Sequence, residues 1–222
     1  MHLLSASDFT PAGYPVMLAP DEIQLWLFTP DDRPAASGAN DMRLRALLAA
    51  YLGCAPDAVS IGRGEHGKPF LAGSRAFEFN VSHSGGALLV GIAQGQALGV
   101  DIETPRRVRP VLDLARRFFA ADEALALAQL DEALQQIAFL RLWSCKEAVV
   151  KALGSGIGFG LARLQFAIGP TGEPRELSVI HASAGTPQDW HIQNLRPTIA
   201  QVGALAWRGP PRRVRAFVAA AE

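Results

Sequence analysis

The sequence contains few of the residues on which disulfide frameworks and zinc sites depend. Its 222 residues include only 2 cysteines, Cys54 and Cys145, and 5 histidines. Two cysteines this far apart give neither a disulfide framework nor the ligand spacing of a zinc site. Such cysteine usage is typical of a reducing compartment, and we expect a soluble protein of the cytoplasm.

Long apolar runs and an excess of charge of one sign are also missing. No apolar run approaches the roughly eighteen residues of a membrane span, and no basic segment followed by an apolar one opens the sequence as in a secretory signal. Lys+Arg and Asp+Glu both number 21, which argues against a general affinity for nucleic acid or an anionic membrane. The arginines are nevertheless clustered, which indicates either solvated surface or a docking patch for an acidic partner: Arg106, Arg107, Arg109, Arg116, Arg117, Arg212, Arg213 and Arg215.

Hydrophobic residues make up 49% of the sequence, and their spacing predicts both strands and helices. We expect residues 1–21 to be irregular, and a strand at 23–28 to precede a helix at 42–53 that ends at Gly53. Three segments separated by short turns (77–84, 87–93 and 97–103) predict an antiparallel meander. A helical segment at 111–130, broken near residue 120, then precedes a helix at 137–154 and strands within 177–207. This order favours an α+β fold.

The last meander strand carries two carboxylates one residue apart. In the stretch ALGVDIE, Leu98, Val100 and Ile102 alternate with Gly99, Asp101 and Glu103. The period of two is typical of a strand with one buried face. Since a strand rises about 3.3 Å per residue, Asp101 and Glu103 point the same way about 6.7 Å apart.

A narrow polar line runs along the otherwise apolar helix 137–154. It consists of Arg141, Ser144, Glu147 and Lys151. On an exposed helix, Glu147 and Lys151 would form an ordinary surface ion pair. If the line instead faces the Asp101 strand, three carboxylates would repel by roughly 2–4 kcal/mol per pair. A hard cation, Mg²⁺, would relieve that repulsion and complete its coordination with substrate phosphates.

Taken together, five stretches resemble one enzyme family, the surfactin-synthetase-type class of 4′-phosphopantetheinyl transferases. Its members are large, monomeric enzymes. They are GKPF (67–70), FNVSHSGG (79–86), GVDIE (99–103), ARRFF (115–119) and LWSCKEAVVKALGSGIG (142–158). The resemblance covers roughly residues 60–168, and the pair formed by GVDIE and the late W-S-x-K-E-A-x-x-K motif is its most specific part.

The resemblance implies two pseudo-symmetric halves, each a small, mainly antiparallel sheet packed with helices, with the active site in the cleft between them. The halves would be residues 1–104 and 105–222. It also implies a site: Asp101, Glu103 and Glu147 bind Mg²⁺; Glu147, Lys151 and His83 are catalytic; and Gly67, Lys68, Pro69, Ser82, His83, Lys146 and Lys151 contact coenzyme A.

In this family a carrier-protein serine attacks the β-phosphate of coenzyme A, and adenosine 3′,5′-bisphosphate leaves. We expect Glu147 to take the serine proton, as ligand, as base or as both. The helix at 111–120, with its arginines, would dock an acidic acyl- or peptidyl-carrier protein. The chain departs from the family in one respect, because the basic stretch that binds the adenosine 3′-phosphate is missing; Arg33, Arg43 and Arg45 are its only substitutes.

Two alternative functions stay open on the residues alone. A relative that has lost coenzyme A affinity would bind carrier proteins without modifying them. A Mg²⁺-dependent hydrolase of nucleotide pyrophosphates would use the same carboxylates without a carrier.

Overall fold

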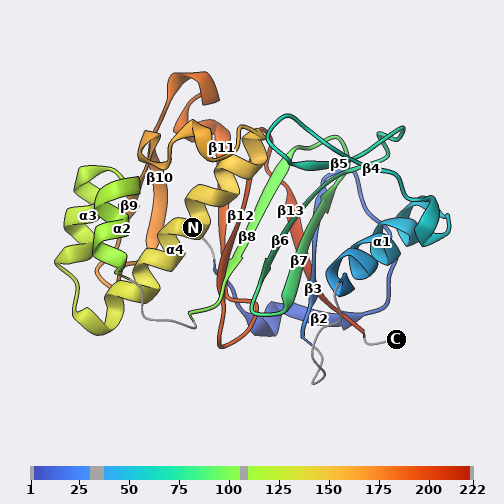
Figure 1. Ribbon diagram of the computed structural model, residues 1–222, viewed down its shortest axis with the longest axis horizontal. Coiled ribbons are helices and arrows are strands. Elements are labelled where there is room, and N and C mark those ends of the chain that lie inside the picture. The colour runs from blue at the N-terminus through green and yellow to red at the C-terminus, as the bar shows by residue number, and fades with distance from the viewer. Residues whose placement is uncertain (1–2, 31–37, 106–109, 221–222) are drawn as a thin grey trace.

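Two larger sheets form the centre of the protein. The structure is a computed structural model that describes residues 3–30, 38–105 and 110–220 (Figure 1). The five-stranded sheet has the order β2 (Phe9–Ala12), β13 (Arg213–Ala219), β3 (Glu22–Phe28), β7 (Ala87–Ala93) and β6 (Glu78–Ser84). The four-stranded sheet has the order β1 (Leu3–Leu4), β11 (Trp190–Leu195), β12 (Val202–Arg208) and β8 (Leu98–Glu103).

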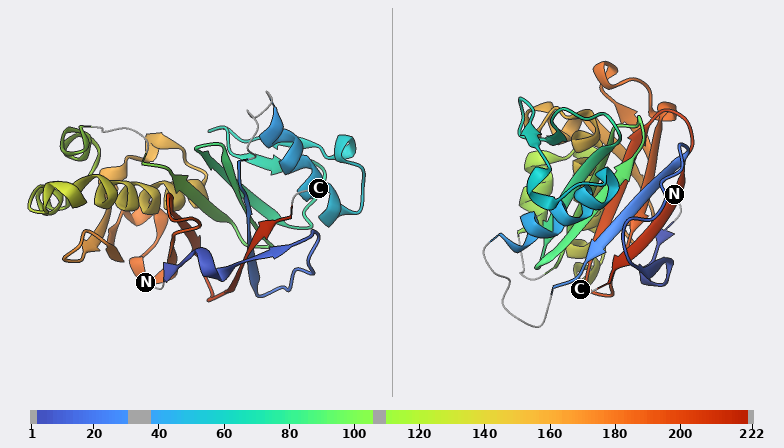
Figure 2. Two further views of the ribbon diagram at one scale, coloured as in Figure 1. Left: turned by 90° about the horizontal axis from the view of Figure 1, so that it is seen from below. Right: turned by 90° about the vertical axis from the view of Figure 1, so that its right-hand side faces the viewer.

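Helices cover the two sheets from opposite sides (Figures 1 and 2). The helices are α1 (Ala39–Leu52), α2 (Val111–Phe118), α3 (Ala121–Ala128) and α4 (Glu132–Leu153). Small two-stranded sheets flank them, β4 (Ile61–Arg63) with β5 (Pro69–Leu71) and β9 (Leu164–Ile168) with β10 (Pro174–Ile180). Short 3₁₀ segments lie at Ala6–Asp8, Pro56–Ala58, Ile157–Phe159, Leu161–Arg163, Ala182–Ala184 and Pro187–Asp189.

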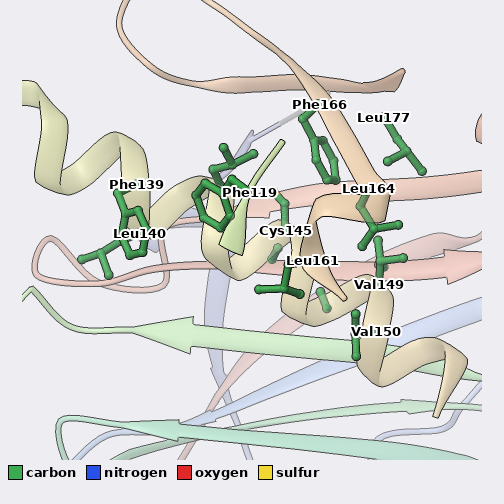
Figure 3. Packing of buried hydrophobic residues seen from close by; sticks show 14 of the residues in the cluster. Phe119, Phe139, Leu140, Cys145, Val149, Val150, Leu161, Leu164, Phe166 and Leu177 are labelled. Atoms are coloured by element: carbon green, nitrogen blue, oxygen red, sulfur yellow. The ribbon is translucent and has the colours of Figure 1, made fainter. Parts of the chain in front are cut away.

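Three hydrophobic clusters join these layers. Leu47 and Leu48 of α1 pack with Trp26 on one face of the five-stranded sheet. A second cluster, which includes Leu25 and Val100, fills the space between the two sheets. A third surrounds α4, whose side chains are buried on several faces against α2, α3, β9 and β12. Figure 3 shows part of this cluster, including Phe139, Cys145 and Val149 of α4. Burial on several sides agrees with the nearly continuous apolar pattern of this helix.

Helix α4 lies directly against β8 because Gly99 has no side chain. A Cβ added at Gly99 would lie 2.0 Å from the carbonyl oxygen of Ala148 and 2.5 Å from the backbone nitrogen of Ala152. Any larger residue would therefore push the helix away from the strand. The glycine of the GVDIE stretch thus brings the turn of α4 that holds Glu147 and Lys151 close to Asp101.

Several predicted elements are confirmed. The strand predicted at 23–28 is β3, the helix predicted at 42–53 is α1, and Gly53 ends α1 with a φ of +64°. The predicted break near residue 120 separates α2 from α3. The α+β class is correct, and among the described residues no helix is long and apolar enough to cross a membrane.

Two predictions about the strands are wrong. The meander stops after its second strand: β6 and β7 form an antiparallel hairpin, but β8 crosses to the other sheet and pairs with β12. Residues 1–21, expected to be irregular, contribute β1 and β2. Strand β13, which the sequence analysis did not foresee, lies between β2 and β3 in parallel pairing with both.

The two sheets therefore exchange strands across the predicted domain boundary. β13 from the end of the chain is an inner strand of the sheet built mainly from early residues, whereas β8 belongs to the sheet built mainly from late ones. A boundary at residue 104 and a pseudo-symmetry between halves remain predictions.

Candidate active site

The two edges of β8 are satisfied in different ways. On one edge β8 pairs with β12 through backbone hydrogen bonds. On the other, side chains of β6 take the place of a neighbouring backbone: Asn80 Oδ1 accepts the N–H of Val100 at 2.8 Å, and Ser82 Oγ accepts that of Ile102 at 3.3 Å. Ser84 Oγ likewise accepts the N–H of Thr104 at 3.0 Å. The sheets are thus held side by side without merging.

Two lysines bind the carbonyl groups of the same edge. Lys68 Nζ donates to the carbonyl oxygen of Leu98 at 3.2 Å, and Lys151 Nζ donates to that of Val100 at 3.1 Å. Burial lowers the pKa of Lys68, and the negative charge of Glu78 partly offsets this decrease. Two ammonium groups, from the loop before β5 and from α4, therefore lie beside alternate residues of β8.

Asp101 and Glu147 form an incompletely satisfied acidic pair beside Lys151. Asp101 Oδ1 accepts from Lys151 Nζ at 2.7 Å and from Ser82 Oγ at 3.0 Å. Asp101 Oδ2 and Glu147 Oε1 are buried and have no hydrogen-bond partner among the described residues. Burial raises the pKa of Glu147, the charge of Asp101 raises it further, and Lys151 opposes both effects. Such a pair of carboxylates can accept a proton or a cation.

A cavity of about 440 Å³ opens next to this pair and contains most of the predicted loop residues. Its lining comes from the loop before β5, from β6, and from the end of α4 with the loop that follows it: His66, Gly67, Lys68, Pro69, Asn80, Val81, Glu147, Val150, Lys151, Gly154, Gly156 and Gly158. The GKP turn and the catalytic residues predicted on α4 therefore share one cavity wall.

The geometry of the acidic pair bears on the predicted magnesium ligands. Two buried carboxylate oxygens without partners, on Asp101 and Glu147, are the hard donors that Mg²⁺ prefers. Glu103 follows on the same face of β8 and is half-buried. In the described residues, however, no three His, Cys, Asp or Glu side chains are grouped as a metal-binding set. The donor chemistry fits the ion, while the complete ligand set remains a prediction.

Two predicted contact residues occupy different environments. His83 is exposed on β6, where its side chain could meet a ligand. Ser82 is buried and turned toward β8, with its hydroxyl between the N–H of Ile102 and the carboxylate of Asp101. Ser82 thus holds Asp101 in place, whereas the resemblance implied that it contacts coenzyme A.

The position of Lys146 corrects its assignment to coenzyme A binding. Its side chain is fully buried and forms an ion pair with Glu123 of α3 at 2.7 Å. Lys146 Nζ also donates to the carbonyl oxygens of Leu161 and Leu164. Since Lys146 immediately precedes Glu147 on the helix, it points in a different direction, into the core beneath α4.

Of the remaining residues of the polar line on α4, and of the arginines predicted as substitutes for the basic stretch, none that the structure describes lines the cavity beside Glu147. Arg141 lies far enough from Glu147 along α4 to line a different cavity, and Ser144 is fully buried with no partner for its hydroxyl among the described residues. Arg45 binds Asp41 and the carbonyl oxygen of Val59, each at 2.8 Å. Arg33 and the cluster 106–109 lie outside the described residues. Asn80, for which the sequence motif predicted no separate role, lines the cavity and binds β8.

Comparisons with known proteins agree with the prediction of a 4′-phosphopantetheinyl transferase. Residues 97–203 match the model of the 4′-phosphopantetheinyl transferase superfamily, and residues 19–95 match that of the 4′-phosphopantetheinyl transferase N-terminal region. The 4′-phosphopantetheinyl transferase HetI of Nostoc is 36% identical over 170 residues, which span 75% of this chain and 68% of the relative.

Two further relatives match over shorter stretches. A Bacillus subtilis 4′-phosphopantetheinyl transferase is 34% identical over 54% of this chain and 53% of its own length. The Xenopus laevis L-aminoadipate-semialdehyde dehydrogenase-phosphopantetheinyl transferase is 30% identical over 65% of this chain and 51% of its own. The chain thus spans only about half the length of these two relatives. The family models and the Nostoc match show that the chain belongs to the 4′-phosphopantetheinyl transferase superfamily and is an enzyme of that class.

Proposed function

We propose that this enzyme transfers the 4′-phosphopantetheine arm of coenzyme A to a serine of an acyl- or peptidyl-carrier protein, with Mg²⁺, as a monomer of the surfactin-synthetase type. The observation that carries the proposal is the pair of buried oxygens without a partner among the described residues, Asp101 Oδ2 and Glu147 Oε1, beside the ammonium group of Lys151. Lys68 lines the same cavity as Glu147 and Lys151. One carboxylate, Glu147, and two lysines at one cavity wall suit a substrate whose phosphates need neutralisation and a nucleophile whose proton needs an acceptor.

Glu147 is the proton acceptor in this mechanism. The serine oxygen attacks the β-phosphorus of coenzyme A, its O–P bond forms as the bond to the leaving phosphate breaks, and the serine proton passes to Glu147. The leaving group is adenosine 3′,5′-bisphosphate. A carboxylate whose pKa is raised by burial is a stronger base than one in water, so the environment of Glu147 suits this step.

The two lysines neutralise phosphate oxygens. Both ammonium groups are bound to carbonyl oxygens of β8 and each has further donor capacity, since an ammonium group offers three hydrogens. Lys151 lies one helical turn after Glu147, so one short segment of α4 supplies both the base and a positive charge. His83 would add a donor from the exposed end of β6.

Asp101, Glu103 and Glu147 would hold the metal, with Ser82 fixing the orientation of Asp101. When bound, Mg²⁺ stabilises charge that develops on the leaving phosphate. The carrier would dock on α2, where Arg116 and Arg117 are exposed. The two unpaired cysteines are compatible with the reducing cytoplasm as the place of reaction.

The decisive experiment incubates an apo carrier protein with coenzyme A and MgCl₂ and measures the carrier's mass. We expect one phosphopantetheine to be added per carrier, no addition with EDTA, and no addition by a Glu147→Gln variant that stays folded. Carrier binding without any mass gain or coenzyme A binding would instead favour a non-catalytic binding protein. Release of phosphopantetheine without a carrier would favour a pyrophosphate hydrolase. Wild-type rates from Glu147→Gln would show that the base is misassigned.

A further inference from the structure

A second cavity, of about 850 Å³, lies between α4, the β9–β10 hairpin and the β1–β11 edge of the four-stranded sheet. It shares no lining residue with the cavity beside Glu147. From α4 it receives Arg141, which belongs to the polar line of this helix but has no role in the proposed reaction. This cavity therefore needs an explanation of its own.

Two arginines of this cavity have no counter-charge of their own. Arg141 is half-buried, Arg196 follows the end of β11, and neither side chain makes an ion pair or hydrogen bond within the part of the chain described. Burial lowers the pKa of Arg141, and the positive charge of Arg196 lowers it further. The two guanidinium groups thus repel each other in a partly desolvated place.

The acidic residues of the lining do not compensate this repulsion. Glu173 attracts Arg141 but affects its pKa less than Arg196 does. Its carboxylate is engaged by Arg175 at 3.1 Å and by the backbone N–H and hydroxyl of Thr171 at 3.0 and 2.8 Å. Glu176, the other acid of the lining, is exposed. An anionic ligand would satisfy both free guanidinium groups at once.

The charge and the walls of the cavity indicate which kind of anion fits. Two positive charges are matched by a phosphate monoester, which carries about −1.5 to −2 at pH 7, better than by a single carboxylate. Guanidinium groups also bind phosphate oxygens with paired hydrogen bonds. Ile168, Leu195 and Val202 add apolar surface to the same cavity, whose volume far exceeds that of one phosphate group.

We propose that this cavity is a second ligand site, which binds a phosphate monoester with an apolar organic part and holds its phosphoryl group between Arg141 and Arg196. The site is separate from the transferase cavity and does not depend on the transfer reaction.

Phenyl phosphate is a suitable probe, with inorganic phosphate and benzoate as comparisons, each titrated by calorimetry at matched ionic strength. We expect phenyl phosphate to bind more tightly than either comparison. Arg141→Gln and Arg196→Gln should each weaken its binding at least tenfold. Arg208→Gln is the matched control, because Arg208 is an exposed arginine paired with Asp189 outside this cavity and should leave binding unchanged.

A Lys151→Met variant separates this site from the transferase cavity, since it should retain phenyl phosphate binding at the second site. Arg196 is exposed, so its variant tests the site even where Arg141→Gln does not fold. Unchanged affinity in both arginine variants, benzoate binding as tightly as phenyl phosphate, or no binding of any probe would each overturn the proposal.

Discussion

Two lysines on α4, five positions apart, form ion pairs of the same length in very different surroundings. Lys146 Nζ lies 2.7 Å from Glu123, and Lys151 Nζ lies 2.7 Å from Asp101. The first pair is 0% and 3% exposed, and the second is 26% and 7% exposed. Distance alone would give both pairs the same role.

The difference lies in how completely each pair is satisfied. Lys146 also binds two carbonyl groups and lies over the rings of Phe119 and Phe166, while Glu123 accepts the backbone N–H groups of Ala120 and Phe166. In the second pair, Asp101 keeps an oxygen that has no partner in the described parts of the chain. We call an ion pair saturated when its polar atoms all have hydrogen-bond partners, and such a pair stabilises the fold. We call it unsaturated when one of its atoms lacks a partner, and such a pair at a cavity wall is available to a ligand.

The largest effect is expected from breaking the saturated pair. Replacing Lys146 by Met leaves the buried charge of Glu123 without its partner, which should lower the free energy of unfolding by about 3–5 kcal/mol. Urea denaturation measures this change. Adding Glu123→Gln to the same chain should restore part of the stability, because Gln carries no charge and still accepts hydrogen bonds.

The same Lys146→Met protein tests the assignment in a second way. Well below its unfolding temperature it should keep its transferase activity per folded molecule. A stable Lys146→Met protein with lost coenzyme A binding would restore the assignment made from the sequence.

Breaking the unsaturated pair should lower activity strongly and stability only slightly. Lys151→Met should lower carrier modification by about 10²–10³-fold, the range found when one positioned donor to a transition-state charge is removed. Its free energy of unfolding should change far less than that of Lys146→Met, because water reaches this pair. Rates from the carrier mass assay and denaturation curves give the two numbers, and a stability loss as large as that of Lys146→Met would abolish the distinction.

The contrast between these lysines also shows how far sequence can lead. Both belong to one short motif, and helical periodicity placed both on α4. What separates them is contact with partners distant in sequence, Glu123 for one and Asp101 for the other, and no local pattern reports those contacts. The strands follow the same rule: the alternation at 97–103 predicted β8 correctly, but its pairing with β12 depends on residues a hundred positions later.

The roles of the glycines and of the polar residues on β6 were also only partly predictable from the sequence. Gly53 ends α1 through local backbone geometry, so it was predictable. The reason for Gly99 lies in the backbone of α4, which only the folded chain brings near. Ser82 was predicted to contact coenzyme A, and no role was predicted for Asn80 or Ser84, whereas all three side chains bind the edge of β8 in the structure.

Ser82 and Ser84 both accept backbone N–H groups beside β8, but only Ser82 also binds Asp101, so replacing each in turn separates the two roles. Ser82→Ala leaves the buried N–H of Ile102 without its acceptor and should lower the free energy of unfolding by about 1–3 kcal/mol. It also frees Asp101, so kcat should fall and more Mg²⁺ should be needed for half-maximal rate. Ser84→Ala, which removes the acceptor of Thr104 but no contact with Asp101, is the control and should leave the Mg²⁺ requirement unchanged. Equal Mg²⁺ curves for the two variants would show that Ser82 serves only the sheets.

The smallest effect concerns how stability changes with pH at Glu147. Because burial raises the pKa of this carboxyl in the folded state, the unfolded chain ionises first as pH rises above the ordinary glutamate value of 4.5. The contribution of Glu147 to stability is therefore complete below that pH and is lost as pH rises through the folded pKa. Glu147→Gln should match the wild type in acid and become relatively more stable toward neutral pH.

Denaturation curves for both proteins across this range measure the difference. Lys146→Met gives the matched contrast, since it should be less stable than wild type throughout. A Glu147→Gln protein that loses stability relative to wild type as pH rises would mean that the folded protein favours the ionised carboxylate. Glu147 would then be a satisfied member of the pair with Lys151, and the contrast with the buried pair at Lys146 would no longer distinguish a binding site from a structural one.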